Sequence, residues 1–232
     1  MDSTATEAET PQHGYRSGYA KSKSISEQVK ILRRIFPDIG FADERLAEKQ
    51  LPNHAEGWFA IPRWQLIAPS YGEAVRKVFD KLKEERKGRF HDFFLAPDTS
   101  CEGNLLETDK KRDIFQKLGE EQDTQGILVV AAQFGLRYRG IPSLGVRTGT
   151  DLHEFCLGAF EVGVMLLTHP DRLMCFDDLH IHCAGDNYDL DLDGDPEDVL
   201  SLGFDVEGLE VEHCWIGLKD GSAGAATGFL PQ

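Results

Sequence analysis

The segment VLSLGFDVEGLEVEHCWIGL, residues 199–218, decides the fold expected for this chain. Its two apolar runs are separated by Glu207 and Gly208, and a glycine between two runs of strand-forming residues predicts a tight hairpin. Further apolar runs at residues 179–183 and 224–230 are set apart by Gly and Asp, which are typical turn residues. The C-terminal third is therefore predicted to form a small antiparallel sheet.

Helical patterns dominate the N-terminal two thirds. Ser24 followed by Glu27, and Ser70 followed by Glu73, are capping boxes, a local signal for the first turn of a helix. The apolar spacing predicts helices at 24–36, 43–50, 70–87, 104–118 and 151–168, and strands at 57–62 and 126–132. The predicted fold class is α+β, with one domain over residues 24–232 and a disordered arm over residues 1–23.

Two glycines and one strand give expectations about packing. Residues 151–168 are apolar on nearly every face, so this helix is expected to be buried. Gly158 and Gly163 each weaken a helix by about 1 kcal/mol relative to Ala, so both are expected where a neighbouring element approaches closely. The continuous apolar run at 126–132 is typical of a central strand that is buried on both faces.

Charge and composition narrow the classes of partner. The 232 residues carry a net charge of −15, and residues 177–212 contain 13 Asp and Glu without any Lys or Arg. This charge disfavours a nucleic acid or an anionic membrane surface as the main partner. The five cysteines form no Cys-x-x-Cys pair. Because we find neither a signal peptide nor an apolar run long enough for a membrane span, we expect a cytoplasmic protein, with export by another route still open.

Alternating acidic residues indicate a candidate calcium site. Asp189, Asp191 and Asp193 precede Gly194, in the pattern of oxygen ligands that opens a calcium-binding loop. The twelfth position, where a bidentate Glu usually closes the coordination shell, is Leu200. Calcium is therefore the candidate cofactor, and a solvated acidic turn is the alternative.

A second pattern, Asp178-x-His180-x-His182, would place three metal-ligating side chains on one face of a strand. Together with Asp186 and a second ion in the acidic loop, it predicts a metal-dependent hydrolase, which is the alternative function. The metal-dependent barrels that open with this motif take further ligands from later strands. Only 50 residues follow His182, so membership of that family is rejected. Two surface or partly buried histidines are the other interpretation.

Three stretches resemble known proteins: residues 161–170 (EVGVMLLTHP), residues 177–186 and residues 221–232. They resemble uncharacterised proteins of uncultivated bacteria and, through these, the variable proteins of diversity-generating retroelements. The resemblance implies a C-type-lectin-like fold. In such proteins the C-terminal strands and loops display diversified amino acids, while the final strand stays fixed.

On this resemblance the chain is a ligand-binding display protein and not an enzyme, with a variable region at about residues 199–222. The expected contact residues are Asp205, Glu207, His213, Trp215, Leu218, Lys219 and Asp220. Trp and His offer a large contact area with a polar tip at low entropic cost. For Trp215, a place in the core is the alternative. The ligand would be an unknown protein or surface, and homo-oligomers would be compatible with display because repeated sites gain avidity.

Overall fold

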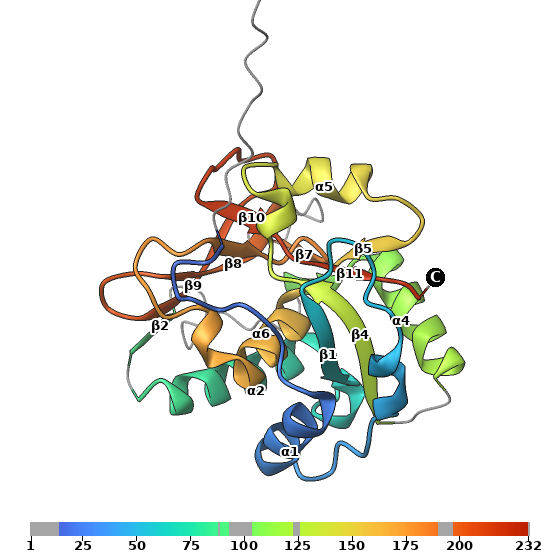
Figure 1. Ribbon diagram of the computed structural model, residues 1–232. Coiled ribbons are helices and arrows are strands. Elements are labelled where there is room, and N and C mark those ends of the chain that lie inside the picture. The colour runs from blue at the N-terminus through green and yellow to red at the C-terminus, as the bar shows by residue number, and fades with distance from the viewer. Residues whose placement is uncertain (1–13, 88, 93–103, 123–125, 190–196, 232) are drawn as a thin grey trace, which may run out of the picture.

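The computed structural model describes residues 14–87, 89–92, 104–122, 126–189 and 197–231, and its strands form two sheets (Figure 1). The first sheet has four strands, all antiparallel, in the order β1-β4-β11-β5. These strands are β1 (Gly57–Pro62), β4 (Ile127–Gln133), β5 (Glu154–Cys156) and β11 (Thr227–Phe229). A strand from the C-terminal region therefore lies between two strands from the middle of the chain.

The second sheet is mixed and has seven strands. Its central strand, β8, pairs antiparallel with β9 along one edge and with β6 and β7 along the other. Strands β2 and β10 are added in parallel, to β9 and β6 respectively, and β3 pairs antiparallel with β7. The bounds are β2 (Phe90–Asp92), β3 (Leu105–Glu107), β6 (His180–His182), β7 (Asp186–Tyr188), β8 (Asp198–Phe204), β9 (Leu209–Trp215) and β10 (Ala223–Ala225).

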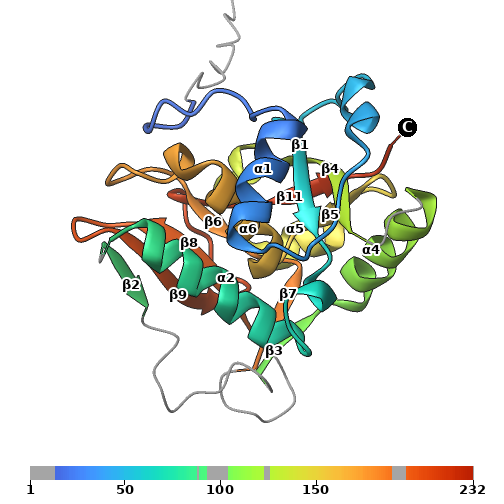
Figure 2. The same cartoon turned by 90° about the horizontal axis from the view of Figure 1, so that it is seen from below.

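Helix α6 (Ala159–Thr168) is the most deeply placed helix, and all of its residues are buried. It contacts helices α1 and α2 and strand β1, and Figures 1 and 2 place it between β1 and the β8–β9 pair. A Cβ on Gly163 would lie 2.6 Å from Cγ1 of Val78, so only glycine allows α2 to approach this closely. Within the described residues, the other helices are α1 (Ile25–Ile35), α2 (Tyr71–Glu85), α4 (Asp109–Glu121), α5 (Ser143–Gly149), and the short 3-10 turns η1 (Glu44–Glu48), η2 (Trp64–Leu66), η3 (Leu136–Tyr138) and η4 (Pro170–Arg172).

Predictions that rested on local signals are confirmed. The capping box of Ser24 and Glu27 begins α1. At the start of α2 one half of the predicted box is seen, in which the Ser70 hydroxyl accepts a hydrogen bond from the Glu73 backbone N–H. Strands β1 and β4 match the expected segments, and β4 is buried along its whole length. The predicted hairpin is the β8–β9 pair, in which Phe204 faces Leu209 across the turn.

Two predicted helices begin too early. The segment 104–118 starts with strand β3, and Thr108 then caps α4. The segment 151–168 contains strand β5, and α6 begins only after Gly158. Both strands have three residues, too few to interrupt an apolar pattern visibly, and they exist because β7 and β11 pair with them. The expected role of Gly158 in close packing is confirmed, because a Cβ there would overlap the Asp186 carboxylate.

Two further expectations need correction. The sheet at the C-terminal end is mixed and larger than predicted, since β2 and β3 join it from the N-terminal half. Residues 14–23 are not a loose arm: Tyr15 and Tyr19 are buried, and the Tyr15 ring stacks on the Arg172 guanidinium at 3.5 Å. The rest of the predicted arm lies outside the described residues.

The architecture as a whole is mixed α and β, compatible with α+β. Among the described helices, none is both long enough and apolar enough to cross a membrane.

Candidate functional site

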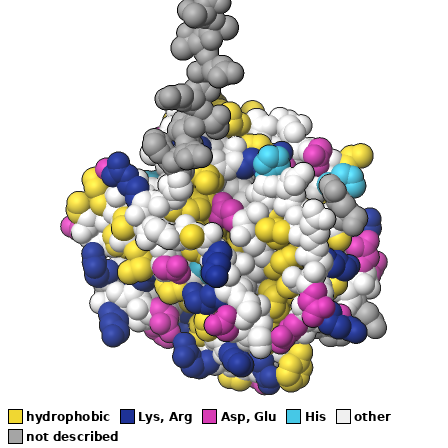
Figure 3. All heavy atoms as spheres, in the orientation of Figure 1, with side chains coloured by type: hydrophobic (Ala, Val, Ile, Leu, Met, Phe, Trp, Pro, Cys, Tyr) yellow, Lys and Arg dark blue, Asp and Glu magenta, His cyan; other side chains and the backbone are white. Residues whose placement is uncertain are grey.

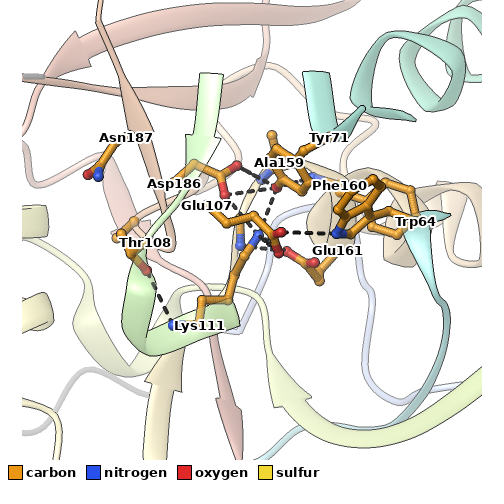
Figure 4. A network of polar contacts seen from close by, with 12 residues as sticks. Trp64, Tyr71, Glu107, Thr108, Lys111, Ala159, Phe160, Glu161, Asp186 and Asn187 are labelled. Carbon is orange, nitrogen blue, oxygen red and sulfur yellow. Dashed lines mark hydrogen bonds and ion pairs between the residues drawn. The ribbon is translucent and has the colours of Figure 1, made fainter. Parts of the chain in front are cut away.

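Strand β3 and helix α4 place a buried lysine beside several carboxylates (Figure 4). Thr108 follows the strand directly and caps the helix. Glu107 and Lys111, which are four residues apart in the sequence, therefore lie on the same side of the first turn. The Lys111 ammonium lies 2.8 Å from Asp186, 2.9 Å from Glu161 and 3.5 Å from Glu107. It also donates to the Tyr71 hydroxyl at 2.8 Å. These five residues are called the Lys111 cluster below.

Asp186 ties the Lys111 cluster to the start of helix α6. Its carboxylate accepts hydrogen bonds from the Tyr71 hydroxyl at 2.8 Å and from the Ala159 backbone N–H at 2.6 Å. Glu161 accepts from the Gly158 backbone N–H at 2.9 Å, as the third residue of the helix does in a capping box. Negative charge at a helix N-terminus is favourable because it meets unpaired N–H groups and the positive end of the helix dipole.

Burial controls the protonation of the Lys111 cluster. Burial alone would lower the pKa of Lys111, but the carboxylates of Asp186, Glu161 and Glu107 raise it above its usual value, so the ammonium stays charged. Burial raises the pKa of Glu161, and the Lys111 ammonium opposes this effect. Three carboxylates thus share one ammonium, which leaves the cluster with an excess of negative charge when all are ionised.

A hollow of about 700 Å³ lies against the Lys111 cluster. Glu107 and Glu161 belong both to the cluster and to the wall of the hollow. The Trp64 indole also lines it and donates to Glu107 at 3.0 Å. Other parts of the wall come from Arg63 next to η2 and from helix α4. A cavity of this volume is in the range of small-molecule sites.

The sequence-predicted contact residues near the end of β9 lie on the surface. Trp215 is 57% exposed and Leu218 is 43% exposed, so the alternative of a core tryptophan is wrong. Lys219 is exposed as well, and Asp220 is half-buried and accepts from the Ser222 backbone and hydroxyl. His213 is exposed and lies 3.4 Å from the Asp198 carboxylate on the paired strand.

Asp205 and Glu207 do not share this surface. They lie in the β8–β9 turn, whereas Trp215 ends β9, so the length of the strand, roughly 20 Å at ~3.4 Å per residue, separates the two groups. Asp205 accepts from the backbone N–H groups of Glu207 and Gly208 at 2.7 Å, which is a turn-stabilising role. The expectation of one surface for all seven residues is therefore corrected.

The two metal hypotheses stand differently, because the calcium pattern remains a prediction while the histidine pattern can be compared with the structure. Asp191 and Asp193 of the calcium pattern lie outside the described residues, and the backbone N–H of Asp189 donates to Asn104. His180, His182 and Asp186 do not gather, because Asp186 is held in the Lys111 cluster. Within the described ranges, no three His, Cys, Asp or Glu side chains form a group that could hold a metal ion.

His182 contacts two potential reaction partners. Its Nδ1 lies 3.1 Å from the Ser143 hydroxyl and its Nε2 lies 3.6 Å from Cys214 Sγ, an arrangement of nucleophile, base and orienting group. Burial lowers the pKa of His182 to about 4 and raises the pKa of Cys214 to about 12. The resting pair is therefore a neutral thiol and a neutral imidazole, which makes Cys214 a poor nucleophile.

Comparisons of the chain with protein-family models, with curated proteins and with solved structures found no match. Sequence reasoning missed the Lys111 cluster altogether. One signal was present: Glu161 lies alone in the most apolar helix of the chain, and a buried carboxylate needs a partner. The partner itself, Lys111, comes from a distant segment and has no local signature.

Proposed function

We propose that the protein is a ligand-binding protein whose contact surface lies at the end of β9. The observation that carries this proposal is the joint exposure of Trp215 and Leu218, two large apolar side chains separated by two residues. Ile141 and Leu144, 45% and 50% exposed, lie at the start of α5. The Leu144 backbone N–H donates to Ile216 at 2.9 Å, which joins α5 to this segment. These four residues are called the Trp215 surface.

The chemistry of the Trp215 surface fits a protein ligand. Exposed aromatic and leucine side chains beside polar ones are typical of protein interfaces, in which a few apolar anchors provide most of the binding energy. His213, Lys219 and Asp220 supply the polar neighbours. The face of the molecule in Figure 3 carries interspersed acidic, basic and apolar side chains, without one continuous charged field. The net charge of −15 disfavours a nucleic acid.

Diversified display on a C-type-lectin-like scaffold is the specific form of this proposal. It is supported by the position of β11, which lies between β4 and β5 and is buried, while the residues just before β10 are exposed. A scaffold of this kind tolerates substitution at surface positions without a change in the sheet that follows them.

The test of this proposal is the sequence of the 3′ end of the gene across a population of the source organism, together with the flanking DNA. Differences concentrated in the codons for residues 213–220, with a near-repeat and a reverse transcriptase nearby, would support display. An invariant segment without these neighbours would contradict it. A Trp215→Ala variant that folds as the wild type does would show in parallel that the side chain is free to contact a ligand.

A further inference from the structure

The hollow beside the Lys111 cluster has two chemically different ends. At its inner end, Glu107 and Glu161 are nearly inaccessible to solvent, with side-chain exposures of 8% and 2%. Two arginines, Arg63 and Arg112, also line the hollow. A molecule that fills it would therefore meet both carboxylates and guanidinium groups, and Glu120 of α4 adds a further carboxylate to the lining.

The inner end carries more negative charge than positive charge. Three carboxylates surround the single ammonium of Lys111, and one of them, Glu107, is only loosely paired, at 3.5 Å. Asp186 accepts hydrogen bonds from Tyr71 and the Ala159 backbone and is not among the residues that line the hollow, whereas Glu107 and Glu161 line it. A second ammonium group placed at these two side chains would reduce the excess of negative charge and donate further hydrogen bonds.

The arginine side has unused hydrogen-bonding capacity. The Nε of Arg63 is buried and has no hydrogen-bond partner among the described residues. The guanidinium lies against Gly119 of α4, where a Cβ would overlap it, so the absence of a side chain at Gly119 makes room for Arg63. Arg112 pairs with Asp109 on the surface of the helix, an exposed contact of the kind that contributes little to stability. A carboxylate is the natural ligand of such guanidinium groups.

We propose that this hollow is a binding site for a small zwitterion, an amino acid or a close analogue, with its ammonium group at Glu107 and Glu161 and its carboxylate at Arg63. The site is independent of the Trp215 surface. Trp64 and Phe160 also line the hollow and provide apolar surface for the rest of the ligand.

Binding at this site is coupled to protons. Burial raises the pKa of Glu161, which favours its protonated form more than in an exposed carboxyl group. A ligand ammonium favours the ionised carboxylate and lowers that pKa. Binding therefore releases protons, and the affinity increases as the pH rises through the pKa of Glu161.

The experiment is isothermal titration of the full chain with zwitterions of increasing length: glycine, β-alanine, γ-aminobutyrate and ε-aminohexanoate. Hexanoate and hexylamine are the matched probes that lack one charge each. We expect one length of zwitterion to bind with a dissociation constant in the millimolar range or below, and to bind about tenfold or more tightly than either single-charge probe. Repeating the titration in buffers of different ionisation enthalpy should show that protons are released on binding.

Variants distinguish binding in this hollow from effects of a substitution on folding or on other parts of the surface. Glu107→Gln and Arg63→Met should each weaken binding by about tenfold or more, because each removes one charged partner. Lys117→Met on the exposed face of α4 and Trp215→Ala should leave it unchanged. The proposal is overturned if no zwitterion binds, if hexanoate or hexylamine binds equally well, or if Arg63→Met, which leaves the Lys111 cluster intact, binds as the wild type does.

Discussion

Replacement of Lys111 by methionine tests the central claim about the buried charges. Methionine keeps most of the volume and removes only the ammonium group, which now contacts Asp186, Glu161, Glu107 and the Tyr71 hydroxyl. Removing one partner of a buried ion pair costs about 3–5 kcal/mol, because the remaining charge is left without compensation. We expect a loss of about 5 kcal/mol in the free energy of unfolding at pH 7.

The loss should depend on pH in a defined direction. The variant can restore the net charge of the Lys111 cluster by taking up one proton on a carboxylate. For a carboxyl group with an ordinary pKa near 4.3, that uptake costs about 3.7 kcal/mol at pH 7 and about 1 kcal/mol at pH 5. With roughly 1 kcal/mol added for lost hydrogen bonds, the deficit of the variant should shrink to about 2 kcal/mol at pH 5.

The assay is urea unfolding of both proteins, followed by circular dichroism at pH 7 and pH 5. Lys110→Met is the matched control, because Lys110 is the neighbouring residue, is exposed and donates only to Thr150 in the described structure. It should change the free energy of unfolding by less than about 1 kcal/mol. A Lys111→Met deficit below 1 kcal/mol at pH 7, or one that grows on acidification, would refute the reasoning.

The remaining predictions concern packing, exposure and acid stability. Gly163→Ala should cost about 1–2 kcal/mol, because the new Cβ would lie 2.6 Å from Val78 Cγ1, and a midpoint in thermal unfolding at or above that of the wild type would contradict it. Trp215→Ala should change stability by less than about 1 kcal/mol, while Val211→Ala, in the buried part of the same strand, should cost about 2 kcal/mol; equal losses in denaturant titrations would be inconsistent with the exposed position of Trp215. Burial lowers the pKa of His182 to about 4, below its unfolded value near 6.5, so the folded protein should lose up to about 3 kcal/mol from this group as the pH falls from 6.5 to 4. A His182→Gln variant should show a shallower loss of stability over that pH range, and an unchanged slope would argue against a buried neutral imidazole.

The predictable parts of this fold are those with local causes. The caps at Ser24 and Ser70 need only a neighbour three residues away, and the hairpin needs only a glycine between two apolar runs. Strand β5 could not be predicted in the same way, because its partner β11 lies about seventy residues further along. Two of its three residues, Phe155 and Cys156, are apolar, as residues of a buried helix would be, and only the pairing distinguishes the two.

The candidate sites, too, could be predicted only where their cause lies within one segment of the chain. Alternation along β9 did not show which face is buried, because the strand changes from buried residues at Val211 to exposed ones at Trp215. The separation of Asp205 from Trp215 follows from the length of the strand once the hairpin register is known. The Lys111 cluster joins α2, β3, α4, α6 and β7, and no spacing within one segment could reveal it.

The position of β11 determines what happens to chains that are cut short by a premature stop or a frameshift. In the first sheet, β5 reaches β4 only through β11, so neither the free edge of β4 nor β5 can be paired until residues 227–229 have been synthesised. A premature stop or a frameshift anywhere between β5 and β11 leaves two open strand edges and an uncovered apolar core, the features that lead to aggregation and degradation. Complete pairing of the first sheet therefore requires that the segment between β5 and β11 is translated in frame to its end. We expect substitutions of Trp215 and Leu218, which lie in that segment and are exposed, to leave these strand edges paired, whereas truncation within the segment leaves them open.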